Sequence, residues 1–134
     1  MKKGILIGTG IGITLLLVVV ILTNHPSTQV NHIAEIQPKF TVAIAMSASR
    51  PGCENTGCYL PTELSIAKHD SVTWINGDRG FHTVTTGYYD TPDGTFDSGH
   101  VSPSEKFSYT FDQSGEFHYY CRLHPWMEGK IIVN

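Results

Sequence analysis

Residues 115–130 read GEFHYYCRLHPWMEGK, and this stretch decides how the chain is interpreted. Its first half alternates, so that two aromatic side chains share a face with Cys121, as in a strand with one buried face. Cys121, His124 and Met127 then follow at three-residue intervals and can converge on one point. Thiolate and thioether are soft ligands, and two imidazoles with one cysteine and a distant methionine define an electron-transfer copper site.

The second imidazole has to come from elsewhere among the seven histidines. His118 shares the strand of Cys121 but points to the opposite face, so strand parity excludes it. His82 shares a face with the apolar Val84 in a predicted strand, and it follows a turn that contains glycine, which places it inward at a strand end. His100 is the alternative. The predicted ligands of a single copper ion are therefore His82, Cys121, His124 and Met127.

Zinc is the rival metal for this set. Structural zinc sites gather four cysteine or histidine ligands, whereas this chain offers three such ligands and a thioether. Met127 therefore favours copper over zinc.

From Phe40 onward, apolar residues recur with period 2. Strand-like runs are predicted at 40–46, 63–67, 71–76, 81–86, 106–111, 115–121 and 130–133. Turn-forming residues separate several of these runs, at 68–70, 76–78, 91–94 and 113–115. Short strands at this spacing predict an all-β domain, an antiparallel sandwich of about seven or eight strands.

The N-terminus predicts a membrane anchor. Residues 4–22 carry no charge and follow Lys2 and Lys3, which fits one transmembrane helix with the rest of the chain outside the cytoplasm. We divide the chain into an anchor at 1–23, a polar linker at 24–39 and a domain at 40–134. A cleaved signal peptide is the alternative, and it would also export the domain.

The three cysteines fit an exported domain that binds metal. Cys53 and Cys58 lie in a segment rich in glycine and proline and are predicted to form a disulfide. Cys121 is then the unpaired thiol and is free to bind metal.

The composition excludes other classes of protein. The chain is 40% hydrophobic and 16% charged, which is ordinary for a folded domain. Its formal net charge is −3 and it has no basic run, so we expect no nucleic-acid partner.

Two segments resemble the plastocyanin and azurin group of cupredoxins, namely SVTWIN at 71–76 with His82, and YYCRLHPWMEGKIIV at 119–133. The spacing of the ligand loop is most similar to that of the amicyanins. The resemblance implies a Greek-key β-sandwich that binds one type 1 copper through the four residues named above. Many relatives have asparagine after the first histidine, where this chain has Thr83, whose hydroxyl can make a similar bond. The pair Cys53 and Cys58 resembles cysteine pairs of archaeal cupredoxins.

These features predict a one-electron carrier, held at the membrane on its extracytoplasmic side, rather than an enzyme. Transient redox partners are expected to dock on the surface formed by His124, Pro125 and Trp126. This surface is small and largely apolar, and the interfaces of transient redox complexes are small. Small-molecule redox chemistry at the copper, for example with nitric oxide, and a copper chaperone or storage role are the alternatives.

Overall fold

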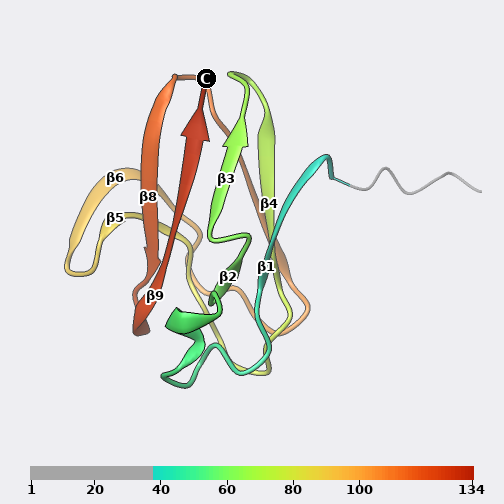
Figure 1. Cartoon of the computed structure of the whole chain (residues 1–134), viewed down its shortest axis with the longest axis vertical. Coiled ribbons are helices and arrows are strands. Elements are labelled where there is room, and N and C mark those ends of the chain that lie inside the picture. Colours follow the sequence, from blue (N-terminus) through green and yellow to red (C-terminus); the bar gives the residue numbers. More distant parts are fainter. Residues whose placement is uncertain (1–37) are drawn as a thin grey trace, which may run out of the picture. The chain divides into compact units, whose positions relative to one another are not determined.

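A computed structural model describes residues 38–134, which form two β-sheets with a shared core (Figure 1). One sheet has the order β2-β1-β4-β7, built from β1 (Phe40–Ile44), β2 (Tyr59–Leu60), β4 (Ser71–Asn76) and β7 (Lys106–Thr110). The other has the order β3-β9-β8-β5-β6, built from β3 (Glu63–Ile66), β5 (Thr85–Tyr88), β6 (Thr91–Asp97), β8 (Gly115–Cys121) and β9 (His124–Val133). A single 3₁₀ turn, η1 (Cys53–Asn55), is the only helical element among these residues.

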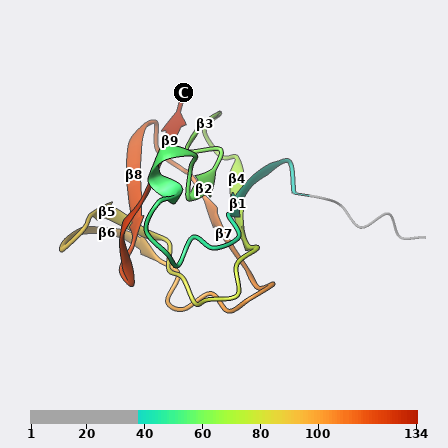
Figure 2. The same cartoon turned by 60° about the horizontal axis from the view of Figure 1, so that its bottom comes forward.

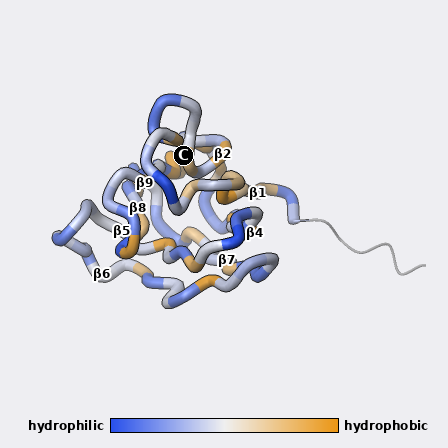
Figure 3. Tube along the Cα trace, turned by 90° about the horizontal axis from the view of Figure 1, so that it is seen from below, coloured by the Kyte–Doolittle hydropathy of each residue, from blue (hydrophilic) through white to orange (hydrophobic). Residues whose placement is uncertain are grey.

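The core lies between the sheets and follows from the period-2 pattern of the strands. Val42 and Ile44 of β1 are buried, as are Val72 and Trp74 of β4, with Ile131 opposite on β9. Figure 3, which looks along the strands, shows hydrophobic and hydrophilic segments interspersed along the tube. Each inward face thus removes its apolar side chains from water.

The all-β sandwich expected from the sequence is confirmed, but its strands are not all antiparallel. β1 pairs with β4 in parallel, and so does β3 with β9, while the other ladders are antiparallel. Residues 38–134 form nine strands rather than seven or eight. The alternation of side chains identifies a strand but does not show in which direction it runs. A chain that crosses between two sheets can pair with its neighbouring strand in parallel or antiparallel.

The turn predicted at 91–94 is wrong, because these residues begin strand β6. The chain turns instead just before them, where Asp90 has a φ of 63°. Pro92 is tolerated because β6 is the edge strand of its sheet, where a proline removes no required ladder hydrogen bond.

Two other boundaries differ from the prediction. β5 begins only at Thr85, so His82 lies before the strand and joins the fold through an isolated β-bridge to Val101. β9 begins at His124 rather than at residue 130, so the expected ligand loop is mostly strand. β8 ends and β9 begins at the lower end of Figure 1, where η1 also lies.

The predicted anchor and nearly all of the predicted linker lie outside the described residues. Within residues 38–134, no helix is long and apolar enough to span a membrane.

Candidate metal centre

Cys121 and His124 face each other across a tight hairpin. Cys121 ends β8, His124 begins β9, and the two are register partners with only two residues between them. Cys121 Sγ lies 3.5 Å from His124 Nδ1. Cys121 is fully buried, whereas His124 is partly exposed. The hairpin therefore holds the thiol inside and brings the imidazole to the rim.

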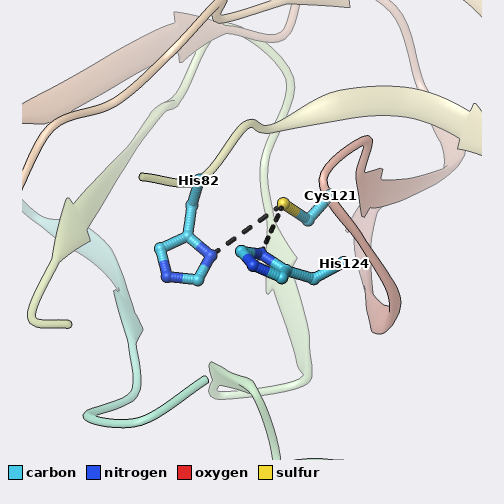
Figure 4. Close-up of side chains that lie close together, drawn as sticks. All are labelled: His82, Cys121 and His124. Atoms are coloured by element: carbon cyan, nitrogen blue, oxygen red, sulfur yellow. Dashed lines mark hydrogen bonds between the residues drawn. The ribbon is translucent and has the colours of Figure 1, made fainter. Parts of the chain in front are cut away.

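His82 reaches the same point from a different part of the chain. Its ring is fully buried and its Nδ1 lies 3.9 Å from Cys121 Sγ. The two imidazole rings approach to 4.8 Å between centroids. Figure 4 shows the three side chains converging, with both histidine rings turned toward the sulfur.

A network of hydrogen bonds fixes the loop that carries His82. Asn76 is buried, and its side-chain amide donates to the carbonyls of Gly80, at 2.8 Å, and Val101, at 2.9 Å. The backbone N–H of Asp78 donates to the Asn76 side-chain oxygen at 2.9 Å. Asn76 thus ties the turn to the strand before it and to the residue that bridges His82.

Asp78 braces His82 from behind. Its Oδ2 lies 3.0 Å from His82 Nε2, and both side chains are buried. The carboxylate also accepts the backbone N–H groups of Ser47 at 2.8 Å, Ser49 at 2.9 Å and Arg79 at 2.8 Å. Burial alone would raise the pKa of Asp78, but these donors and His82 hold it well below its ordinary value.

The contact with Asp78 decides the tautomer of His82. An ionised carboxylate only accepts hydrogen bonds, so Nε2 must carry the proton. Nδ1 then keeps its lone pair, and this is the atom that faces Cys121. Burial lowers the pKa of His82, but its contacts with Cys121 and Asp78 outweigh burial and raise the pKa above 6.5. Burial and the nearby His82 both lower the pKa of His124.

The surroundings of Cys121 favour its thiolate, the form that binds metal. Burial raises the pKa of the thiol, and hydrogen bonds with His82 and the backbone N–H groups of Thr83 and Leu123 outweigh burial, so the pKa lies below its ordinary value. The N–H of Thr83 lies 3.3 Å from Cys121 Sγ.

Thr83 also fastens the hairpin through its side chain. Its hydroxyl accepts the backbone N–H of Arg122 at 2.8 Å, so it makes the kind of bond expected from a residue that replaces asparagine. The guanidinium of Arg122 pairs with Asp97 at 2.9 Å. Together these contacts hold the turn between the two ligand-bearing strands.

Met127 and Trp126 complete the surroundings on β9. Met127 is fully buried, three residues after His124 on the same strand. Trp126 is only partly buried, its ring lies 5.4 Å from that of His124, and its Nε1–H donates to the carbonyl of Ala48 at 3.0 Å. Pro125, between His124 and Trp126, is exposed.

The donor set fits a small soft metal ion. The ligand atoms of His82, Cys121 and His124 all lie within 4.8 Å of one another. Metal–sulfur and metal–nitrogen bonds of about 2.3 and 2.0 Å place such atoms roughly 3.5–4 Å apart in a trigonal plane. Among the described residues the other cluster of this kind is Cys53, Glu54 and Cys58, whose sulfurs are joined in a disulfide of 2.00 Å. His100 is exposed and is not part of the converging group.

Several residues that position this group were not predicted from the sequence. Asp78, Ser47, Ser49, Ala48 and Tyr59 all act on it, but four of them come from a segment that no motif connects to the histidines. The one available signal was an acidic residue four positions before His82. A histidine that binds metal commonly donates its other N–H to a carboxylate.

Comparison with known proteins supports the copper reading of the site. Residues 52–134 match the family model described as copper binding proteins of the plastocyanin/azurin family. The amicyanin of Paracoccus versutus is 31% identical over 75 residues, which cover 56% of this chain and 57% of the amicyanin. The plastocyanin of Physcomitrium patens is 34% identical over 85 residues, covering 57% of this chain and 50% of that protein. The chain thus spans about half the length of these curated relatives.

Solved structures agree with the sequence relatives. A purple cupredoxin from Nitrosopumilus maritimus superposes with a TM-score of 0.66 at 26% identity, covering 71% of this chain and 99% of the other. A reduced Cu(I) form of an amicyanin mutant superposes with a TM-score of 0.56 at 27% identity, covering 71% and 81%. Cupredoxins of this kind bind one copper ion and are generally one-electron carriers. This chain belongs to the plastocyanin/azurin family of copper-binding cupredoxins.

Proposed function

We propose that this chain carries single electrons on one copper ion held by His82, Cys121, His124 and Met127. The observation that carries the proposal is the convergence of one buried thiol and two imidazole nitrogens, at 3.5 and 3.9 Å, from two separate parts of the chain. Met127 is the expected axial ligand, because it is buried and follows His124 by three residues, and type 1 sites have a distant axial methionine. Copper bound there would supply one-electron chemistry by cycling between two oxidation states.

The residues around the group limit how far any ligand can move. His82 is held through Asp78, and Cys121 through the N–H of Thr83. The hairpin register fixes His124 relative to Cys121. A ligand set that is held rigid by hydrogen bonds changes little between two oxidation states, which favours fast electron transfer.

Redox partners are proposed to dock where His124 reaches the surface. Pro125 beside it is exposed, and so is the large apolar side chain of Leu123, at 43%. Trp126 contributes less surface than expected, since it is partly buried and its N–H is bound to Ala48. A small apolar rim around one ligand suits transient complexes, whose interfaces are small.

The setting at a membrane is proposed from the sequence. The uncharged stretch at 4–22 would anchor the domain, single-pass, with the copper site on the extracytoplasmic side. The disulfide between Cys53 and Cys58 suits an oxidising compartment outside the cytoplasm.

Copper titration of the full chain in detergent tests the proposed function. We expect one equivalent of Cu(II) to give an intense thiolate-to-copper band in the visible and an EPR signal with narrow hyperfine splitting. Cys121→Ser should lose both. A colourless wild-type protein, or a band that survives in Cys121→Ser, contradicts the proposal.

A further inference from the structure

Residues 47–59, here called the clamp segment, lie outside the two segments that resemble the cupredoxin family, but they contact residues around the metal centre. The segment contains η1 and the disulfide between Cys53 and Cys58. η1 packs against β9, and Figure 2 shows it beside that strand. The segment makes three separate connections to residues that surround the proposed ligands.

The first connection reaches His82. The backbone N–H groups of Ser47 and Ser49 donate to opposite oxygens of the Asp78 carboxylate, at 2.8 and 2.9 Å. Oδ2 of the same carboxylate also contacts His82 Nε2 at 3.0 Å. The clamp segment therefore fixes the side chain that orients His82.

The second connection reaches β9 between His124 and Met127. The carbonyl of Ala48 accepts the indole N–H of Trp126 at 3.0 Å. Cys58 Sγ lies 3.8 Å from the carbonyl oxygen of Trp126. The clamp segment thus contacts both the side chain and the backbone of Trp126.

The third connection reaches the sulfur of Cys121. Tyr59 is fully buried, and its hydroxyl donates to the carbonyl of Thr83 at 2.6 Å. The N–H of Thr83 lies 3.3 Å from Cys121 Sγ, and its hydroxyl holds Arg122. Tyr59 therefore acts on the thiolate through one residue.

The segment is itself tied down at both ends. The N–H of Ala45 donates to the carbonyl of Cys58 at 2.9 Å, which closes the segment at its base. The disulfide closes a shorter loop within it. Because these residues are fixed in place, their hydrogen bonds can hold the side chains around the metal centre in one orientation.

We propose that the clamp segment sets the reduction potential and the visible absorption of the metal centre. Tyr59 of the segment acts through Thr83, and Asp78, which the segment holds, acts through His82; both are positioning residues. The proposal rests on the proposed function, because it concerns the same copper site. Hydrogen bonds to a ligand sulfur are a general means of tuning a redox potential. Without the Tyr59 hydroxyl, the peptide group between Thr83 and Val84 keeps only its hydrogen bond from the Val84 N–H to the Ser98 hydroxyl, at 2.8 Å. Thr83 is then held less firmly, and the bond from its own N–H to the sulfur weakens.

Two tyrosines that pack together offer a matched test. Tyr59 and Tyr119 are both buried, with ring centroids 4.9 Å apart, but the hydroxyl of Tyr119 has no hydrogen-bond partner in the described part of the chain. Tyr59→Phe should shift the thiolate-to-copper band and lower the reduction potential, because a weaker bond to the sulfur favours the oxidised form. Tyr119→Phe removes the same atom and should change neither. Both are measured in the full chain by absorption and redox titration.

A second variant keeps the test decisive if Tyr59→Phe does not fold. The double substitution Cys53→Ser and Cys58→Ser opens the clamp segment and should shift the same band. If the wild-type protein has the band, and both variants leave the position of the band and the reduction potential unchanged, the proposal that the clamp segment acts on the metal centre is wrong, while the proposed function stands. If the wild-type protein has no such band, the proposed function is wrong, and the proposal for the clamp segment is wrong with it.

Discussion

Asp78 and His82 form a carboxylate–imidazole pair that is almost completely shielded from water, with Oδ2 and Nε2 3.0 Å apart. Because the carboxylate takes the proton-bearing nitrogen, the ring is left with one lone pair, on the side of Cys121. A second pair of the same kind, His69 with Asp112 at 3.1 Å, lies on the surface. The two pairs allow the effect of burial and location to be separated from the effect of the contact itself.

Removing the buried partner should weaken copper binding. Asp78→Ala leaves His82 free to change tautomer and to rotate, and loss of such a supporting contact costs about 10–100-fold in metal affinity. Competition titration with a copper chelator measures this loss. The control is Asp112→Ala, which removes the exposed partner of His69 and should leave the affinity unchanged. Equal affinity in Asp78→Ala and wild type would contradict the orienting role.

The stability of the copper-free protein should fall in acid because of the same carboxylate. The pKa of Asp78 is lowered by folding, so the folded state prefers its ionised form more strongly than the unfolded chain does. This contribution is complete above the unfolded value of about 3.9 and is lost as the pH falls below it. Urea unfolding between pH 6 and pH 3 should show a smaller decline in the free energy of unfolding for Asp78→Asn than for wild type. Parallel curves would contradict the assignment.

Met127 should act on the redox potential more than on folding. Met127→Leu keeps the apolar volume of a fully buried side chain, so we expect a cost below about 1.5 kcal/mol in the free energy of unfolding. Loss of the thioether donor removes a ligand that Cu(II) gains from more than Cu(I), so the reduction potential should rise. Redox titration checks the direction. An unchanged potential would show that Met127 packs near the ion without binding it.

The choice between the two candidate histidines can be tested directly. His82→Ala should abolish the visible band, because His82 is the buried imidazole that faces Cys121. His100→Ala should keep the band, since His100 is exposed, and it should change the free energy of unfolding by less than about 0.5 kcal/mol. The reverse pattern would transfer the ligand role to His100.

The proposed docking rim can be tested without a known partner, by electron self-exchange between reduced and oxidised copies. Leu123→Glu adds negative charge beside His124 in a protein whose formal net charge is already −3, so the two copies should repel at this face. We expect the exchange rate, measured by NMR line broadening, to fall about tenfold at low salt. Tyr88→Glu adds the same charge to an exposed residue at the tip of the β5–β6 hairpin and serves as the control. Equal rates in the two variants would argue against docking at Leu123.

Much of the site followed from local patterns in the sequence. The spacing of Cys121 and His124 placed a thiol and an imidazole together, and the hairpin register brings them together in the structure. Parity also placed His82 on the inside, although strand β5 begins at Thr85, four residues later than predicted, and does not include His82. The burial of His82 was therefore predicted correctly, but residues 82–87 are all buried, so this segment has no exposed face that parity could separate from a buried one.

The supporting contacts could not be predicted in this way. Trp126 meets the carbonyl of Ala48, and Tyr59 meets that of Thr83, across separations of 78 and 24 residues. Such contacts depend on which strands become neighbours and in which direction they run. The parallel pairing of β1 with β4 was not expected, and strand direction is not encoded in the alternation of side chains.

The short separation of Cys53 and Cys58 also bears on how the protein matures. Closing a loop of so few residues costs little chain entropy, so these thiols meet far more readily than either meets Cys121. Once joined, they are removed from competition for the copper ion and from mispairing with Cys121, which is left as the only free thiol. Oxidation of the pair before metal loading therefore directs the ion to Cys121, and a cell that reversed this order would risk trapping copper between the wrong sulfurs.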